Sequence, residues 1–452
     1  MLFCGIDLGT TNTKAVIVDE DLRMLDKITI SLPLIGDRCT SDANVWQSHF
    51  CRIIEYFGSR GLINKSNKVA CCISAQGGTF ILLDDKYRAV APACSWRERS
   101  NQTMVQGLAN HCNAQSYYTS TGWYPSISSM ACKLKQMMES NSDITNQFSY
   151  VSSIPEFIHS QIAGEFITDI TTAQMTGIAD INTCSWDKKV LEWLHLKEVN
   201  FAKISYHPEL ISEDISVAGN LISLTTSIHD QYAAMYAAGL ASDDSIMLGT
   251  GTAWVISGKS TQLLYDENIS IHPGRDLWPN SYGYIIGLGP IGKEFDILCK
   301  KLMLSSNDIE RICLELTHSS NLDYDIVIGL MEPSQDMAMT NKKICLEQYM
   351  LKVAARVAVF LKKLQKHESV NKIIMTGGAA HNVYIPRIIA NLANLPVEVM
   401  HFNEFSAYGA ALFAMGAVSG QPVRHKPKWM KSVLYEPGSS AVKLEQRNIN
   451  VV

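Results

Sequence analysis

Two stretches of the chain, one at its start and one past its middle, share a strand–turn–strand pattern whose turn is rich in glycine and threonine. The first covers residues 2–18 around a turn at 7–13, and the second covers residues 245–257 around a turn at 249–252. β-Prone apolar residues flank each turn, which predicts a hairpin. Glycines leave backbone N–H groups bare, and such groups can wrap a polyphosphate closely. The repetition predicts two similar α/β halves, each opening with a phosphate-binding hairpin.

A third glycine-rich turn lies at residues 376–382, after an apolar strand at 372–375 and before a helix predicted at 383–392. Alone, Gly377-Gly378 would indicate only a strand-to-helix turn. Beside the two hairpins it predicts a place where adenosine approaches the start of a helix. Lys14 can add a point charge for the terminal phosphate. The residues predicted to bind ATP are Gly9, Thr10, Thr11, Asn12, Lys14, Gly249, Thr250, Gly251, Thr252, Gly377, Gly378, Ala379 and Asn382.

Two aspartates are the candidates for chemistry. Asp7, at the first turn, is a hard oxygen ligand that could hold Mg²⁺ directly or through water; its alternative role is to bond its own backbone in the turn. Asp230 precedes an alanine-rich helical segment at 231–238, at the position of an N-cap. A carboxylate there could take the proton of an attacking hydroxyl, or it could only cap the helix. Because capping keeps the carboxylate ionised, the two roles are compatible. Its neighbour His229 is expected to be a packing or hydrogen-bonding residue.

A substrate-binding surface is predicted from polar and aromatic residues in the first half of the chain. Carbohydrates present dense hydroxyl groups that need polar partners, and an aromatic face can cover a carbon skeleton. Taken alone, the segment Trp96-Arg97-Glu98-Arg99 would be a solvated charged turn. The residues predicted to contact substrate are Gln76, Gly77, Trp96, Glu98, Arg99, Asp230 and Gln231.

The length of 452 residues, with 46% hydrophobic content, suits two domains of roughly 200 residues each. We predict an N-terminal domain at 1–241, a C-terminal domain at 245–420 and a tail at 421–452, with an interdomain cleft as the ligand site. The stretch 407–418 is too short to span a bilayer and predicts a buried helix. A second core helix is predicted from apolar residues at helical spacing: Leu346, Met350, Val353, Val357, Phe360 and Leu364.

The net charge and the cysteine pattern limit the classes of partner that we expect. The net charge is −5 and no basic stripe is present, which argues against nucleic acid. The first residues lack the basic region of a signal peptide. The twelve cysteines show no zinc spacing. We therefore expect a cytoplasmic protein whose thiols are reduced. We expect a small-molecule substrate, no membrane association and a possible homodimer.

Taken in order, these motifs resemble the FGGY family of carbohydrate kinases, within the sugar kinase, actin and heat-shock chaperone superfamily. The resemblance covers roughly residues 2–258 and 370–420. It implies two ribonuclease-H-like domains that close on ATP-Mg²⁺ and a sugar or polyol, with Asp230 as the catalytic aspartate. The matching segments are Asp7-Leu8-Gly9-Thr10-Thr11, Ser74-Ala75-Gln76-Gly77, Trp96-Arg97-Glu98, Thr121-Gly122, Lys133-Leu134, Thr168-Asp169 with Thr172-Ala173, His229-Asp230-Gln231, Leu248-Gly249-Thr250-Gly251-Thr252, Gly377-Gly378-Ala379 and Ala407-Tyr408-Gly409-Ala410-Ala411.

The chain departs from the family pattern in three places. The common Trp-x-Asp-x-Arg becomes Trp96-Arg97-Glu98-Arg99, and the xylulose-type Gln-Met-His-Gly becomes Gln76-Gly77-Gly78-Thr79. The glycine-rich segment expected between residues 301 and 342 is shortened and unrecognisable. The favoured function is phosphorylation of a terminal hydroxyl of a xylulose-like ketose or a polyol. The alternatives are a kinase for glycerol, erythritol or gluconate, a degenerate sugar- or nucleotide-binding relative with little kinase activity, and a chaperone-like or filament ATPase.

Overall fold

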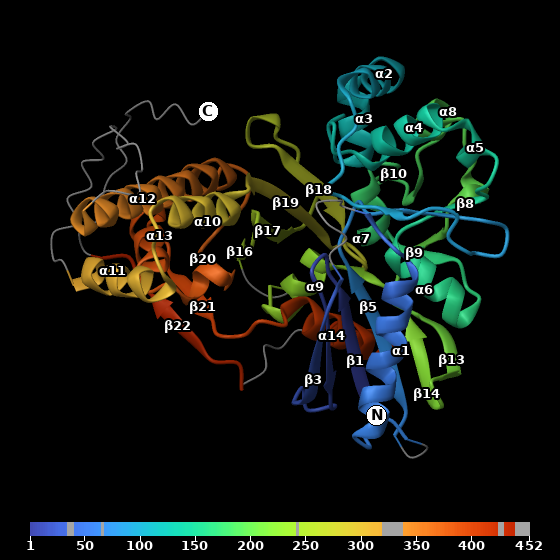
Figure 1. Cartoon of the computed structure of the whole chain (residues 1–452), viewed down its shortest axis with the longest axis horizontal. Helices are drawn as coiled ribbons and strands as arrows, with labels where there is room; N and C mark the ends of the chain where they lie inside the picture. The colour runs from blue at the N-terminus through green and yellow to red at the C-terminus, as the bar shows by residue number, and fades with distance from the viewer. Residues whose placement is uncertain (34–39, 65–66, 241–243, 319–337, 424–428, 439–452) are drawn as a thin grey trace.

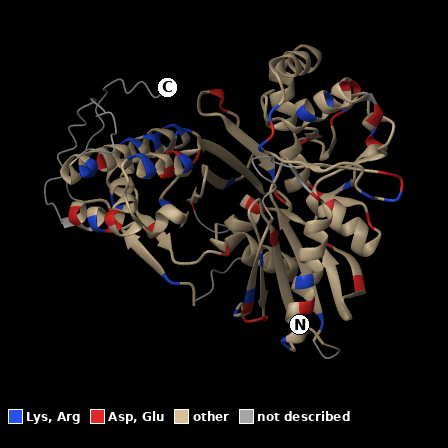
Figure 2. Ribbon diagram, viewed as in Figure 1, with Lys and Arg blue, Asp and Glu red and all other residues tan. Residues whose placement is uncertain are grey.

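The chain folds into two lobes, each built on a seven-stranded sheet (Figure 1). The computed structural model describes residues 1–452 apart from 34–39, 65–66, 241–243, 319–337, 424–428 and 439–452. Acidic and basic residues are interspersed along the outer helices of both lobes (Figure 2).

The first sheet has the strand order β13-β14-β5-β1-β2-β3, and β15 pairs with β5. Strands β1, β2 and β3 are antiparallel, whereas β5 runs parallel to β1. The predicted hairpin is therefore confirmed, with longer strands than the sequence indicates. The strands are β1 (Leu2–Leu8), β2 (Asn12–Val18), β3 (Met24–Ser31), β5 (Val69–Ala75), β13 (Leu210–Val217), β14 (Asn220–Thr225) and β15 (Ile228–His229).

The second sheet repeats this plan, with the order β18-β19-β17-β16-β20-β21-β22. Here β16, β17 and β19 are antiparallel, and β20 runs parallel to β16 just as β5 runs parallel to β1. The repeat predicted from the two hairpins is thus a repeat of sheet topology. The strands are β16 (Ser245–Thr250), β17 (Trp254–Ser260), β18 (Ile271–Arg275), β19 (Tyr282–Gly289), β20 (Lys372–Gly377), β21 (Val397–Met400) and β22 (Ser432–Tyr435).

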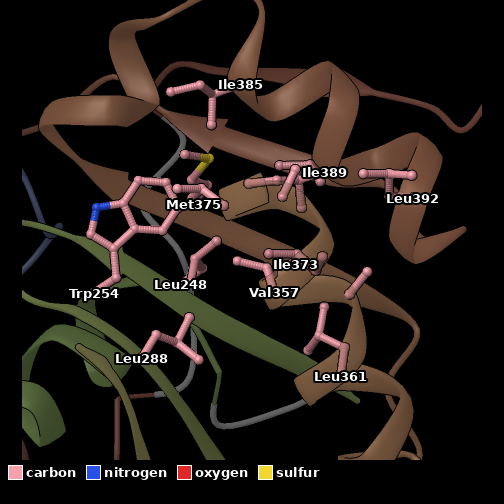
Figure 3. Packing of buried hydrophobic residues seen from close by; sticks show 14 of the residues in the cluster. Leu248, Trp254, Leu288, Val357, Leu361, Ile373, Met375, Ile385, Ile389 and Leu392 are labelled. Carbon is pink, nitrogen blue, oxygen red and sulfur yellow. The ribbon is translucent and has the colours of Figure 1, made fainter. Parts of the chain in front are cut away.

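Helices cover the second sheet through apolar stripes at helical spacing. Figure 3 shows α12 and α13 placing Val357, Leu361 and Ile389 against Leu248 and Ile373 of the sheet. The helix predicted from the 346–364 stripe is confirmed as α12. Helices of the second lobe are α10 (Ile291–Lys301), α11 (Ser306–His318), α12 (Met339–Leu364) and α13 (Ile385–Ala393), with the 3-10 turns η3 (Glu267–Ile269) and η4 (Gly378–His381).

The first sheet carries helices on both faces. Trp46 and Phe50 of α1 and Phe157 of α6 form its core on one face, and α9 and α14 pack on the other. The helices of this layer are α1 (Asn44–Ser59), α6 (Ile154–Ala163), α9 (Asp230–Ala237) and α14 (Phe405–Ser419). The helix predicted at 407–418 is confirmed as buried, and none of the helices in the described parts of the chain is long and apolar enough to span a membrane.

An elaboration between β5 and β13 forms the upper part of the first lobe (Figure 1). It packs around its own core, which includes Leu108, Leu134 and Trp186. Its elements, with the short strand β4 that pairs with β7, are β4 (Thr40–Ser41), β6 (Ile81–Leu83), β7 (Ala93–Cys94), α2 (Gln102–Cys112), α3 (Ala114–Thr121), α4 (Met130–Ser140), α5 (Ser142–Thr145), β8 (Tyr150–Ser152), β9 (Ile167–Asp169), α7 (Ile170–Ala173), η1 (Gln174–Thr176), β10 (Ala179–Asp180), β11 (Ser185–Trp186), α8 (Lys188–Leu194), η2 (Glu198–Asn200) and β12 (Lys203–Ser205).

The edge strand β18 of the second sheet is bonded to this elaboration. The Tyr118 hydroxyl donates to the Ile271 carbonyl at 2.7 Å, and Arg275 Nε donates to the Ile181 carbonyl at 2.7 Å. The rings of Trp123 and His272 stack, with their centroids 4.0 Å apart. The two lobes are therefore joined here as well as through α9 and α14.

Three predictions, the tail at 421–452 among them, fall partly outside the described residues. The shortened segment at 301–342 includes 319–337, and the domain boundary near 239–245 includes 241–243. Within the tail predicted at 421–452, the described strand β22 pairs with β21 and closes one edge of the second sheet.

Glycine permits the close approach of α14 to both α9 and β1. A Cβ atom on Gly409 would overlap the carbonyl oxygen of Ala233 on α9, and one on Gly5 would overlap that of Ala407 on α14. Both obstacles are backbone atoms of packed elements, so a side chain there forces α14 away from α9 or from β1. A helix late in the chain thus completes the layer that carries Asp230.

We expect Gly409→Ala to lower the free energy of unfolding by about 1–3 kcal/mol, the usual cost of overpacking a core. Thermal unfolding of the purified variant measures the loss. Gly287→Ala on β19 is the matched control, because no atom lies within 4 Å of its added methyl group. Equal melting temperatures for the Gly409 variant and wild type would contradict the close packing described here.

Candidate active site

Asp7 lies near the carboxyl end of β1, where neighbouring strands place polar groups beside it. Strand register pairs it with Lys14 on β2 and with Ser74 on β5. The Ser74 hydroxyl donates to Asp7 Oδ1 at 3.5 Å. Burial raises the pKa of Asp7 to about 7, and the charge of Asp230 adds to this rise, whereas Lys14 and Ser74 oppose it. Two carboxylates of like charge therefore share one buried region.

Asp230 reaches the same region because β15 pairs with β5. This pairing sets His229 beside Ala75, and Asp230 then begins α9. The Asp230 side chain is 26% exposed. Burial raises its pKa to about 7, against the opposing hydrogen bonds from Gln231. A carboxylate with a pKa near neutrality can both accept and release a proton under physiological conditions.

The predicted N-cap at Asp230 is wrong by one residue: His229 is the cap. Its backbone is extended (φ −63°, ψ 143°), and its Nδ1 accepts the Gln231 N–H at 3.4 Å. Since Nδ1 accepts, Nε2 carries the proton, and it lies 3.2 Å from Asp230 Oδ1. Burial lowers the pKa of His229 to about 4, so the ring is neutral. The sequence indicated only that His229 is a neighbour; its role as the cap of α9 needed the geometry.

We expect His229→Ala to lower kcat by about 10-fold or more, because it removes the side-chain cap of α9 and the ring that lies beside the Asp230 carboxylate, and a displaced catalytic group can cost about 10²-fold in rate. Steady-state kinetics on the purified variant give the value. His229→Asn keeps a side-chain acceptor for the Gln231 N–H and should recover part of the loss. An alanine variant as active as wild type would show that this residue does not position Asp230.

A buried polar network holds the segment before Asp230. The carboxylate of Asp169 accepts hydrogen bonds from the hydroxyls of Thr171, Thr172 and Ser227. The Thr171 hydroxyl in turn accepts the backbone N–H of His229 at 2.9 Å. The segments 168–169 and 172–173, noted in the sequence without a role, therefore fix the strand that leads into Asp230.

The second hairpin lies beside the start of α9. A Cβ atom on Gly249 would lie 3.9 Å from Gln231 Oε1, so the residue after Asp230 lies close to the strand of the other lobe. The Thr250 hydroxyl donates to the Thr376 carbonyl at 2.7 Å, and Thr250 pairs with Gly377 in the parallel ladder. The predicted phosphate turn and the predicted adenosine turn are thus adjacent.

The remaining residues predicted to bind nucleotide have varied partners. Asn382 Oδ1 accepts the backbone N–H groups of Tyr384 and Ile385 at the start of α13. Lys14 Nζ donates to the Asn403 carbonyl at 3.1 Å, and the Thr252 carbonyl accepts the Lys293 N–H at 3.2 Å. The other positions lie in the two hairpin turns and the adjoining turn: Gly9, Thr10, Thr11, Asn12, Gly251, Gly378 and Ala379.

Predicted substrate residues adjoin the first hairpin. The Thr10 hydroxyl donates to Gln76 Oε1 and accepts Trp96 Nε1–H at 3.2 Å. Gly77 faces His229, because a Cβ atom on Gly77 would lie 2.8 Å from His229 Nε2. The predicted phosphate and sugar segments therefore meet at Thr10.

Glu98 and Arg99 belong to the turn after Trp96. The Glu98 side chain is half-buried. Arg99 is exposed, and its Nη1 donates to three backbone carbonyls of its own turn, those of Trp96, Arg97 and Glu98, at 2.8–3.1 Å. In this arrangement the guanidinium holds the turn that carries Trp96.

Two ribonuclease-H-like lobes, with a glycine-rich hairpin from each near a partly buried carboxylate, define the class: a phosphotransferase with the actin and sugar kinase fold. Family comparison is consistent with this class. Residues 2–233 match the N-terminal domain of the FGGY family of carbohydrate kinases, and residues 335–418 match the C-terminal domain of that family. The chain belongs to the FGGY family of carbohydrate kinases. The family and fold predicted from the sequence are confirmed, and the protein is an ATP-dependent sugar kinase.

Individual relatives are distant. A rhamnulokinase of Pectobacterium carotovorum is 21% identical over 77% of this chain and 74% of its own length. Among solved structures, a gluconate kinase of Lactobacillus acidophilus superposes with a TM-score of 0.83 at 20% identity, covering 97% of this chain and 94% of the other. The glycerol kinase of Plasmodium falciparum with ADP gives 0.80 at 17% identity, covering 96% and 94%. At these identities the structural likeness shows the fold alone.

Proposed function

We propose that this kinase transfers the terminal phosphoryl group of ATP to a terminal hydroxyl of a ketose, xylulose-like in kind, or of a polyol. The proposal is carried by the convergence of both hairpins on Asp230: Asp7 of the first hairpin interacts with its charge, and Gln231 lies beside Gly249 of the second, where an added Cβ atom would come within 3.9 Å of Gln231 Oε1. Phosphoryl transfer depends on alignment and charge stabilisation more than on covalent chemistry. A carboxylate between two phosphate-binding turns suits this reaction.

In this mechanism Asp230 is the general base. The substrate hydroxyl loses its proton to the Asp230 carboxylate as its oxygen attacks the terminal phosphorus of ATP. The bond from that phosphorus to the bridging oxygen breaks, and ADP leaves with the electron pair. His229 lies beside the carboxylate, with Nε2 3.2 Å from Oδ1, and backbone N–H groups of the hairpin turns stabilise the phosphate charge.

The residues at Asp7 fit a magnesium ion. Mg²⁺ is usually held by one or two carboxylates together with waters and substrate phosphates. Burial raises the pKa of Asp7 and the charge of Asp230 raises it further, and a bound cation would relieve that repulsion. When bound, the ion would neutralise phosphate charge, with Asp7 as its protein ligand.

The sugar itself is chosen by the segments at Gln76 and Trp96. Trp96 offers an aromatic face, with the Arg97 guanidinium 5.6 Å from its ring centre, and Gln76 offers an amide. These groups suit a neutral, hydroxyl-rich carbon chain. The absence of a histidine at the Gln76-Gly77-Gly78 turn supports a wider pocket than that of xylulose-type members.

A coupled assay of ATP consumption tests the proposal on xylulose, rhamnulose, gluconate, glycerol and erythritol. We expect consumption that depends on a ketose or polyol, with little ATP hydrolysis in its absence. Faster turnover with gluconate would assign the protein to an aldonate instead. Sugar binding in calorimetry without turnover would assign it to a degenerate binding protein, and substrate-independent hydrolysis would assign it to an ATPase.

A further inference from the structure

Lys133 is a buried lysine whose amine bonds to two separate loops. It lies in the first turn of α4 with 4% of its surface exposed. Its Nζ donates to the carbonyl of Gly78 and to the carbonyl of Ser95, both at 2.9 Å. A buried amine is costly unless its donors are paired. These two bonds tie α4 to a pair of turns that are distant in sequence.

Both turns adjoin predicted substrate residues. Gly78 follows Gln76 and has a left-handed backbone (φ 74°), and Ser95 precedes Trp96. The turns also touch each other: the Trp96 N–H donates to Thr79 Oγ1 at 3.1 Å, and a Cβ atom on Gly78 would lie 3.5 Å from Trp96 Cβ. The position of one turn therefore depends on the other, and the lysine spans both.

We infer that Lys133 is a positioning residue, which sets the spacing between Gln76 and Trp96 and so the fit of the sugar. Its two carbonyl partners lie within two residues of these side chains, so a loss of the amine displaces the side chains directly. The Thr10 hydroxyl is bonded to both Gln76 and Trp96 and links this pair to the first ATP turn only indirectly, so the effect on ATP should be the smaller one. The kinetic part of this inference rests on the proposed function; its structural part does not.

The test compares Lys133→Met with Lys135→Met. Lys135 lies on the same helix and is also buried at 8% exposure, but its Nζ lies 3.7 Å from Glu139 and 5.8 Å from the Trp193 ring centre, away from both turns. Each variant keeps an unbranched side chain of similar length and loses one positive charge from α4. The pair therefore separates the bonds to the turns from the general cost of removing a buried lysine.

The first measurement is hydrogen exchange of the protein without ligands. We expect faster amide exchange in peptides covering 76–80 and 94–98 for Lys133→Met, and wild-type exchange there for Lys135→Met. Unchanged exchange in the Lys133 variant, or equal changes in both variants, overturns the inference. This result does not depend on any activity, so it stands even if the proposed sugar function fails.

The second measurement is steady-state kinetics with whichever of xylulose, rhamnulose, gluconate or glycerol gives the highest turnover. For Lys133→Met, kcat/KM for that compound should fall on the order of 10- to 100-fold, because a displaced positioning group has an effect of this size. The KM for ATP should stay within about 2-fold of wild type. Lys133→Arg, which keeps the donors, should recover part of the loss. Parallel losses for ATP and sugar, or wild-type kinetics, would overturn the positioning role.

Discussion

Replacing Asp230 with asparagine should lower turnover by about 10²-fold or more, while ATP and sugar still bind. The amide keeps the size and the polar contacts of the side chain, but it cannot accept the proton of the substrate hydroxyl. Binding should survive because the hairpin turns and the segments at Gln76 and Trp96 are unchanged. Rapid-quench or steady-state kinetics measure the first effect, and calorimetry with each ligand measures the second.

The control for this variant is its stability. Asp230 has a pKa of about 7 in the fold and a value near 3.9 when unfolded, so the folded state holds the proton more tightly. Its contribution to stability is complete below about pH 4 and is lost as the pH rises to about 7. At pH 8 the wild type therefore carries a buried charge that Asp230→Asn lacks, and the variant should melt at a higher temperature. The difference should shrink as the pH approaches 4.

These two results together separate catalysis from misfolding. A variant that is inactive and more stable at pH 8 has lost a proton acceptor, whereas one that is inactive and less stable has lost structure. Turnover equal to that of wild type would remove Asp230 from the mechanism. A higher melting temperature only at low pH would contradict the raised pKa.

Replacing Asp7 with asparagine should also reduce turnover on the order of 10²-fold, but through the metal. The amide is a weaker ligand for Mg²⁺ than a carboxylate, so the Mg²⁺ concentration needed for half-maximal rate should rise. Titration of activity with Mg²⁺ at saturating ATP measures this shift. Excess Mg²⁺ should recover part of the activity of Asp7→Asn and none of that of Asp230→Asn.

Asp26→Asn is a suitable comparison for Asp7→Asn, because Asp26 lies on β3 of the same sheet, separated from β1 by β2, and bonds Arg60 and Tyr56. It should leave the Mg²⁺ titration unchanged. An identical Mg²⁺ requirement for wild type and Asp7→Asn would exclude Asp7 as the ligand. It would favour the alternative role, in which Asp7 bonds its own backbone in the turn.

The sequence predicted well those parts of the fold that rest on neighbouring residues. Both hairpins, the strand before Gly377 and the helix α12 were visible as alternating or helical patterns, because side-chain burial repeats with a period of 2 or 3.6. It also predicted that Asp7, Asp230 and the segments at Gln76 and Trp96 belong to one site. Their roles in binding and catalysis remain predictions, which the substitutions above address.

Contacts between distant segments were beyond the sequence. It placed His229 as a neighbour and Asp230 as a cap, but which ring nitrogen accepts a hydrogen bond depends on the angle at which β15 enters α9. It noted Lys133 only as part of a pattern, because nothing in a linear chain shows that one amine will meet the carbonyls of Gly78 and Ser95.

The amino-acid order alone thus determined the repeated hairpin, the mixed α/β class and the family, since each depends on local periodicity or on residues contiguous in the chain. The tertiary structure alone decided that α14, from the end of the chain, packs on the first sheet beside α9, and that β18 of the second lobe bonds to the first. The physical reason is that such contacts depend on the shape and close packing of surfaces, where a glycine such as Gly409 matters only once another backbone lies against it.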